Sequence, residues 1–117
     1  MASRTFSIDH NTSLSGNVNA VSPCTGIQYK KCLKNGKMVQ FSGRLSFSEA
    51  ISGEDLLATG LPVPYGLAND KLDFFASILG SQKTVRLRID SSGNLYNGWT
   101  ALAASDNVLI NVVYLSE

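Results

Sequence analysis

The sequence has few of the residues that enzymes use for proton transfer, nucleophilic attack or metal binding. Its 117 residues include one histidine, His10, and two cysteines, Cys24 and Cys32. No Ser-His or Cys-His spacing is present, and the cysteines lack the close paired spacing of a zinc site. The nine acidic residues are scattered, and only Glu54 and Asp55 are adjacent. We therefore expect no catalytic residues, no metal site and no cofactor, in a protein that is not an enzyme.

The sequence also lacks long apolar runs and any strong excess of charge. No stretch approaches the roughly 20 apolar residues of a membrane-spanning helix, and residues 1–6 do not resemble a signal peptide. Ten basic and nine acidic residues give a formal net charge of +1, which provides no broad field for attracting nucleic acid. We expect no membrane insertion, no nucleic-acid partner, and synthesis in the cytoplasm. One basic group, interpreted as a charged hairpin tip, consists of Lys30, Lys31, Lys34 and Lys37.

What the sequence does contain is a series of short segments in which apolar and polar residues alternate. The clearest covers residues 38–51, where the apolar positions are Val39, Phe41, Leu45 and Phe47. Because successive side chains of a strand point to opposite faces, this pattern predicts a strand with one buried face. Gly43 interrupts the apolar side, and it indicates a bend, a bulge or a large neighbour lying over the gap.

The preceding segment predicts the partner strand of a hairpin. Three apolar residues occur at even spacing before Asn35-Gly36, a strong hairpin signal: Ile27, Tyr29 and Leu33. A three-residue turn sets Leu33 opposite Val39 and Tyr29 opposite Gly43, whereas a shorter turn mixes the apolar and polar faces. We therefore expect the three-residue turn, which also sets Ile27 opposite Leu45 and places the Tyr29 ring over Gly43.

Further short strands are predicted along the rest of the chain, and no convincing helix. Residues 71–79 have a pattern that a helix also allows, but their aromatic content favours a strand. Two prolines in Gly60–Gly66 predict a surface loop or a sheet edge. In total, seven or eight strands indicate an all-β fold, an antiparallel β-sandwich or jelly roll over residues 25–117. Residues 1–24 read as an N-terminal arm or linker with a short strand around Thr5–Asp9.

The last predicted strand is apolar on both faces, which distinguishes it from the others. Its first face carries Val108, Ile110, Val112 and Tyr114, and its second carries Leu109, Val113 and Leu115. A sandwich needs only one dry face per strand, so something else must cover the second face. The pattern leaves two alternatives open, the N-terminal arm or another copy of the subunit.

A cluster of aromatic and short polar residues predicts a saccharide-binding surface. It combines flat apolar faces with hydrogen-bonding groups, which suits the C–H patches and hydroxyls of a sugar. The alternative is that the only tryptophan simply belongs to the core. A second, weaker surface is predicted around Tyr65, with Asn69 and Asp70. The residues of the main cluster are Asn94, Tyr96, Asn97, Trp99 and Asp106.

Several segments together resemble the distal domains of bacteriophage and prophage tail proteins, the receptor-binding or baseplate heads of phages of Gram-positive bacteria. The resemblance covers roughly residues 25–117. It is carried by Val39-Gln-Phe-Ser-Gly43-Arg-Leu-Ser-Phe-Ser, Gly60-Leu-Pro-Val-Pro, Val85-Arg-Leu-Arg-Ile-Asp with its Gly93 turn, and Tyr96-Asn-Gly-Trp99 leading to Val108-Leu-Ile-Asn-Val-Val-Tyr114.

This resemblance implies a β-sandwich head that assembles as a homotrimer and binds a host cell-wall polysaccharide, without catalysis. It places the protein at the tail tip of a virion, among other tail proteins, and assigns Leu109 and Val113 to subunit contact. The sequence departs from longer tail proteins because it lacks a coiled-coil or collagen-like shaft. Two other interpretations remain: a purely structural tail or baseplate subunit, and a cellular carbohydrate-binding module or small glycan-active enzyme.

Overall fold

The computed structural model describes residues 12–66 and 70–117, and most of these residues are in strands or loops. The all-β, antiparallel class predicted from the sequence is confirmed. The strand predicted over Thr5–Asp9, together with Asn69, lies outside the described residues. The elements are β1 (Thr12–Ser13), the short 3-10 turn η2 (Ser15–Asn17), β2 (Asn19–Ala20), β3 (Cys24–Asn35), β4 (Met38–Phe47), β5 (Leu56–Thr59), β6 (Leu72–Ile78), β7 (Thr84–Ile89), β8 (Leu95–Asn97) and β9 (Val108–Leu115).

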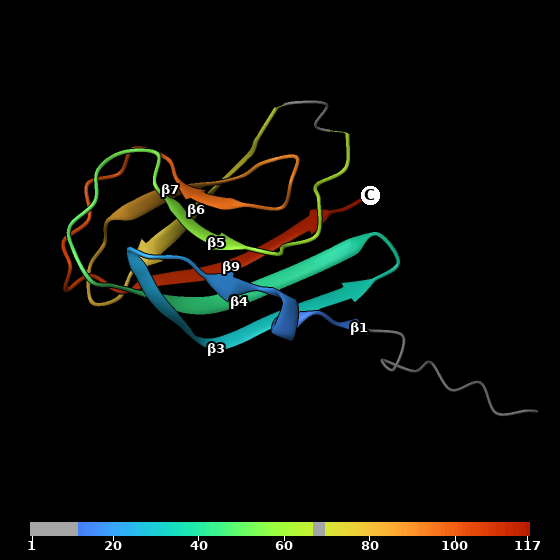
Figure 1. Cartoon of the computed structure of the whole chain (residues 1–117), viewed down its shortest axis with the longest axis horizontal. Coiled ribbons are helices and arrows are strands. Elements are labelled where there is room, and N and C mark those ends of the chain that lie inside the picture. The colour runs from blue at the N-terminus through green and yellow to red at the C-terminus, as the bar shows by residue number, and fades with distance from the viewer. Residues whose placement is uncertain (1–11, 67–69) are drawn as a thin grey trace, which may run out of the picture.

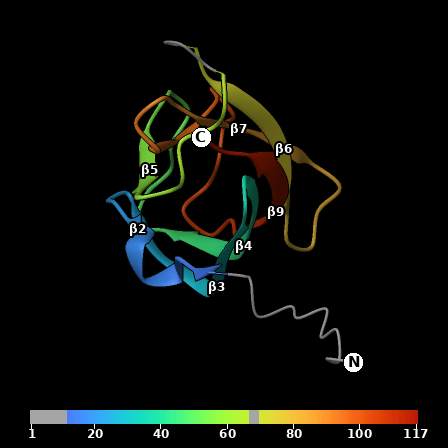
Figure 2. The same cartoon turned by 90° about the vertical axis from the view of Figure 1, so that its right-hand side faces the viewer.

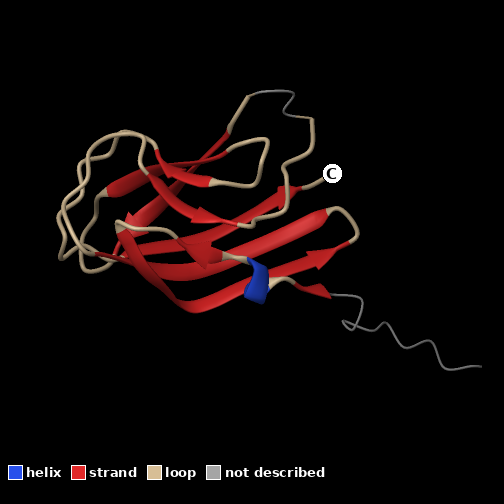
Figure 3. Cartoon of the chain, in the orientation of Figure 1, coloured by secondary structure: helices blue, strands red, loops and turns tan. Residues whose placement is uncertain are grey.

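All nine strands belong to one sheet, in the order β1-β3-β4-β9-β6-β7-β8-β5-β2. The sheet curls around the core like a half-barrel, as Figures 1 and 2 show from two directions. Strands and loops make up nearly all of the described chain (Figure 3). The two edge strands, β1 and β2, follow each other in the sequence, so one short piece of chain reaches both edges of the curl.

That piece, residues 12–21, is here called the closing segment. At one end, the Leu14 N–H donates to the Cys32 carbonyl of β3 at 2.8 Å. At the other end, the Val21 N–H donates to the Leu57 carbonyl of β5 at 2.9 Å. Between them, the Val18 side chain is wholly buried in the core. The closing segment therefore bridges β3 and β5 and fills the opening that the curl would otherwise leave.

The alternating residues predicted to face the core do so. Along β4 and β7, each predicted apolar position is buried, and the polar residues between them are not. The same alternation holds in β6, where a strand rather than a helix is confirmed. The predicted residues that the structure buries are Val39, Phe41, Leu45, Phe47, Ala76, Ile78, Val85, Leu87, Ile89, Val108, Ile110 and Tyr114.

The turn of the β3–β4 hairpin differs from the prediction. Asn35 lies opposite Met38, so the turn contains two residues and the predicted three-residue turn is wrong. In this register Cys32 lies opposite Phe41, and both side chains are wholly buried. Leu33, which was expected to face the core, is only half-buried. The apolar spacing of β3 was misleading because the strand is irregular farther along.

A bulge at Tyr29 and Lys30 is the source of that irregularity. It adds one residue to β3, so beyond it Ile27 lies opposite Leu45, as predicted. Ile27 also covers the bare Gly43, since a Cβ on Gly43 would lie only 2.6 Å from its Cγ2 atom. The Tyr29 ring is 83% exposed and its φ is 55°, so the prediction that it covers Gly43 is wrong.

We expect Gly60→Ala to be severely destabilising, because it would break the contact between the closing segment and β5. Gly60 has φ +89°, and a Cβ there would lie 1.7 Å from the Asn17 carbonyl oxygen. We expect a loss of more than about 3 kcal/mol in the free energy of unfolding, measured by urea denaturation.

Gly16→Ala is the matched control in the same closing segment. A Cβ on Gly16 meets nothing within 4 Å, so its effect should stay within about 0.5 kcal/mol. Equal losses from the two substitutions would contradict the role assigned to the Gly60 contact.

Candidate functional site

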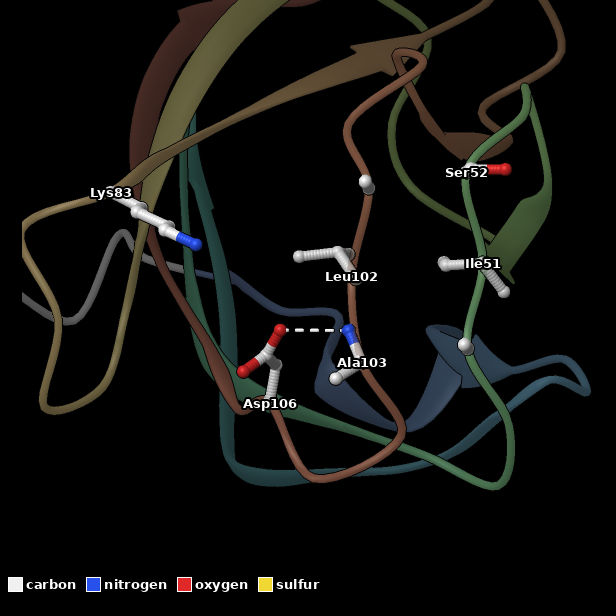
Figure 4. Close-up of a pocket in the computed structure, with 8 residues that line it drawn as sticks. Ile51, Ser52, Lys83, Leu102, Ala103 and Asp106 are labelled. Atoms are coloured by element: carbon white, nitrogen blue, oxygen red, sulfur yellow. Dashed lines mark hydrogen bonds between the residues drawn. The ribbon is translucent and has the colours of Figure 1, made fainter.

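Loops from three parts of the chain meet at the end of the curled sheet where β9 begins. Ile51, in the loop after β4, forms an isolated antiparallel bridge with Leu102, in the loop after β8. Their two backbone hydrogen bonds measure 3.0 and 2.8 Å. Lys83 precedes β7, and Figure 4 shows its side chain extending toward the same space. The bridge thus fixes two of the loops relative to each other.

These loops surround an open depression of about 530 Å³, here called the end hollow. Ile51 and Leu102 contribute apolar surface, and Lys83 and Asp106 contribute one charge of each sign (Figure 4). One Asp106 oxygen, Oδ2, accepts the Ala103 N–H at 2.8 Å, which fixes the position of this carboxylate. The hollow is lined by Ala50, Ile51, Ser52, Lys83, Ala101, Leu102, Ala103 and Asp106.

Trp99 lies beside the end hollow and is not a core residue. Its side chain is 63% exposed, so the alternative that the only tryptophan is buried is wrong. A Cβ on Gly53 would lie 3.9 Å from the Trp99 Cζ3 atom, which places the ring next to the loop that carries Ser52. The φ of Trp99 is +67°, a left-handed conformation that is unfavourable for a large side chain. The backbone therefore holds a bulky aromatic residue outward at an energetic cost.

Asn97 fixes this arrangement from inside. Its side chain is wholly buried, and its Nδ2 atom donates to the Gly53 carbonyl at 2.9 Å and to the Thr100 carbonyl at 2.8 Å. These bonds join the loop before β5 to the turn that carries Trp99. The structure thus places Asn97 as a support for the site, and not at the surface as the predicted saccharide ligand.

Tyr96 lies half-buried on the outer face of β8, away from the end hollow. The Lys71 ammonium is 5.1 Å from the centre of its ring. Burial raises the pKa of the Tyr96 hydroxyl, and the Asp90 carboxylate raises it further. Tyr96 is therefore part of a polar outer face and does not line the depression beside Trp99.

A chain of ion pairs extends over that outer face from Lys71, which contacts Glu54. Glu54 also pairs with Arg88 at 2.9 Å, and Asp73 pairs with both Arg88 and Arg86 at 2.7 Å. The hydrogen bond from Lys71 lowers the pKa of Glu54, and Arg88 adds to the effect. Burial would raise the pKa of Asp73, but its bonds to Arg86 and Arg88 outweigh this and lower it. The pairs stabilise the fold above the ordinary carboxyl pKa, and that contribution fades as the pH falls through the lowered values.

The remaining predicted site residues lie toward the opposite end of the sheet. Asn94 belongs to the turn after β7, where its backbone N–H donates to an Asp90 carboxylate oxygen at 3.0 Å. Tyr65 is 60% exposed and donates its backbone N–H to the Leu115 carbonyl at the far end of β9. Of the predicted cluster, Asp106 lines the end hollow, and Trp99 lies next to Gly53, the residue that follows the lining residue Ser52.

Asp106 is the one lining residue that was predicted, and the two other polar ones, Ser52 and Lys83, were missed. A single serine and a single lysine in turns carry no spacing pattern, and loops from distant parts of the sequence bring them together. The contact between residues 51 and 102 would have indicated the hollow, but a single sequence does not show which distant loops meet.

The second apolar face of β9 is exposed, and it continues onto β6. The predicted interface residues Leu109, Val113 and Leu115 are 37%, 59% and 59% exposed, and Phe75 on β6 is 70% exposed. These four residues are here called the apolar face. Neither residues 12–66 nor residues 70–117 cover this face, so another part of the chain or another molecule could contact it.

Within the described residues, no group of three or more His, Cys, Asp or Glu side chains is arranged to hold a metal ion. In the same part of the chain, no helix is long and apolar enough to cross a membrane. Cys24 and Cys32 are both buried and unpaired, and burial raises the pKa of each thiol.

Comparison with known proteins does not assign the chain to a family. No family model matches it. A stretch of 71 residues, 60% of this chain, is 28% identical to part of Protein ROS1C from Oryza sativa subsp. japonica. That stretch corresponds to 4% of the length of the rice protein, so the likeness says nothing about the whole protein's activity.

Substitution of Asn97 tests whether it supports the Trp99 turn. We expect Asn97→Ala to lower the free energy of unfolding by about 1–3 kcal/mol, because two carbonyls lose a buried donor. Asn94→Ala is the control, since its side-chain bond to Asp90 is long, at 3.3 Å, and only partly buried. Chemical denaturation of both variants provides the measurement. Equal losses from the two substitutions would show that Asn97 has no special role.

Proposed function

We propose that this chain is the head domain of a bacteriophage or prophage tail protein, and that it binds a host cell-surface saccharide without catalysis. Its partners are then host cell-wall polysaccharide and other tail proteins, and its location is the tail tip of the virion. The sequence resemblance supports the class of protein, and the loop end of the sheet supports the binding function. The binding residues under this proposal are Trp99, Asp106, Ser52 and Lys83, with Asn97 as their support.

The outward presentation of Trp99 is the observation that carries the binding proposal. The left-handed conformation of a large residue costs on the order of 1–2 kcal/mol. Burial offsets little of this cost, because the Trp99 side chain remains 63% exposed. Strained residues tend to occur at binding and active sites, where the strain serves function. Core packing does not explain the conformation of Trp99, because most of its side chain is exposed. Asn97 contributes two buried hydrogen bonds to hold the turn in place.

The chemistry beside Trp99 fits a sugar better than an ion or an apolar ligand. The indole offers a flat surface for the C–H face of a pyranose ring. Lys83 and Ser52 provide hydrogen-bond donors, and the Asp106 carboxylate provides an acceptor for hydroxyl groups. The hollow is open, so one or two units of a longer polysaccharide chain have access to it.

We further propose that three copies assemble through the apolar face. Leu109, Val113 and Leu115 supply an exposed apolar surface on a strand whose other side is in the core. Under this proposal the curled sheet is the counterpart of the β-sandwich or jelly-roll head that the resemblance implies. A trimer would present three end hollows, and several weak sugar contacts would then act together.

A structural tail or baseplate subunit is the second candidate, and the exposed apolar face is the observation that favours it. A panel of Gram-positive cell-wall oligosaccharides, tested by isothermal titration calorimetry, separates the two, because an assembly subunit should bind none of them. A cellular carbohydrate-binding module would bind sugar as a monomer, which the solution mass distinguishes.

Trp99→Gly separates a strained binding residue from a structural one. We expect sugar binding to fall at least about tenfold, through loss of the stacking surface. We also expect the free energy of unfolding to hold steady or rise by up to about 1 kcal/mol, because glycine tolerates positive φ. Calorimetric titration and urea denaturation measure the two effects.

Tyr29→Gly is the matched control, since Tyr29 is, among the described residues, also an exposed aromatic residue with positive φ, and it lies outside the end hollow. It should gain stability in the same way and leave sugar binding unchanged. If an oligosaccharide that binds the wild type binds the Trp99→Gly variant equally well, Trp99 is not part of the binding site.

Val113→Arg tests the proposed assembly. An unpaired charge buried between subunits is strongly unfavourable, so we expect light scattering at micromolar concentration to show three copies for wild type and one for the variant. Thr25→Arg, on the exposed side of β3, is the control and should remain assembled. A variant Val113→Arg that assembles as wild type does would show that Val113 faces solvent.

A further inference from the structure

The ladder between β6 and β9 stops after two paired positions. Ser77 pairs with Leu109 and Ile78 pairs with Val108, and the described residues continue the ladder no farther. Figure 1 shows β6 and β9 running in different directions beyond this point. On its other side, β9 is paired with β4 along its whole length. The sheet therefore has an interrupted seam between β6 and β9, within an otherwise continuous run of strands.

Along this seam, part of the β9 backbone has no ladder partner among the described residues. The Leu115 carbonyl accepts the Tyr65 N–H, so its backbone groups face away from β4. Because orientation alternates along a strand, the N–H and C=O of Val113 and Asn111 face the same way. The described part of the chain offers them no ladder partner. This edge is bounded by the Tyr65 bond at one end and by the Ser77 pair at the other.

Side chains next to the seam are apolar and incompletely covered. On the inner side, Leu72, Phe74 and Val112 pack against the core but are only half-buried. On the outer side, Phe75 and Val113 are 70% and 59% exposed. A sheet edge with unpaired backbone groups and apolar side chains on either side can bind an additional β-strand. The ligand that fits is an extended peptide with apolar residues at alternate positions.

We propose that the seam accepts the N-terminal segment Thr5–Asp9 of a neighbouring copy of this chain. The segment precedes the first described residue and is predicted from the sequence as a strand, with Phe6 and Ile8 at alternate positions. Its five residues match the length of β9 between Leu109 and Leu115, and it carries no charge among residues 5–8. This inference rests on the proposed assembly and adds a backbone contact between copies beside the apolar face.

The reach of the chain decides that the segment comes from a neighbour. Thr12 is paired with β3, and four strand spacings separate β1 from the seam, about 19 Å around the outside of the sheet. The three steps from Asp9 to Thr12 extend about 10 Å, which is too short. A segment passed from each copy to the next is a head-to-tail contact, and such contacts close into a ring when the rotation permits.

Hydrogen exchange in the full chain and in a chain lacking residues 1–11 tests this proposal. We expect the amides of Asn111 and Val113 to exchange at least about tenfold faster in the shortened chain, because they lose a backbone acceptor. The amides of Ile110 and Val112 face β4 and serve as internal controls that should not change. Light scattering should show that the shortened chain is monomeric. A synthetic peptide of residues 4–11 should restore slow exchange at both seam amides.

A second variant keeps the full length and changes only the segment. The double substitution Phe6→Asp with Ile8→Asp should reproduce the fast exchange and the monomeric mass. The proposal is overturned if Asn111 and Val113 exchange equally fast in the full and shortened chains, or if the shortened chain remains assembled. A monomeric full chain with protected seam amides would show instead that each segment binds its own subunit.

Sugar binding is an independent readout in these experiments. The end hollow lies at the other end of β9, so the shortened chain should bind a single saccharide unit as the full chain does. If the shortened chain loses assembly but still binds sugar, the seam acts in assembly and not in sugar binding. Failure of the full chain to bind any saccharide, with the exchange and mass results as expected, would instead contradict the proposed sugar binding and leave the seam proposal standing.

Discussion

Closure of a single curled sheet is the constraint on which the rest of the structure depends. The two ends of the sheet, β3 with β1 and β5 with β2, are connected by the closing segment, whose Val18 enters the core. The approach is so close that only glycine fits at position 60, against the Asn17 carbonyl. Because the curl is fixed in this way, the loops at one end converge and form the hollow beside Trp99.

The strands β4, β6, β7 and β9 could be predicted from the sequence because one face of each packs toward the core, and this imposes a period of two. The two-residue strands β1 and β2 are too short to show such a pattern and were not predicted. The exact pairing could not be predicted, since the bulge at Tyr29 changes the register of β3 without any change in composition. For the candidate site, the residue types could be read from the sequence, but their burial could not. Trp99 and Asp106 have side chains typical of sugar sites, whereas Asn97 has the same chemistry but is buried and saturated by two carbonyls.

The two ends of β9 have different roles in this account. Near its first residues, the loops present an aromatic ring beside a hollow with one cation and one carboxylate. Near its last residues, the strand has an exposed apolar face and backbone groups without a ladder partner. Under the proposed function, recognition and assembly would be separated along one strand, so that a tail head could bind sugar while its other end contacts neighbouring subunits.

Backbone chemical-shift mapping is the most direct test of the central claim, that the loop end binds a saccharide. The isotope-labelled chain would be titrated with oligosaccharides prepared from Gram-positive cell walls. We expect the largest shifts in residues 50–53 and 98–106, with Lys83. Shifts confined to the region of Tyr65 and Asn94, or no shifts with any oligosaccharide, would contradict the claim.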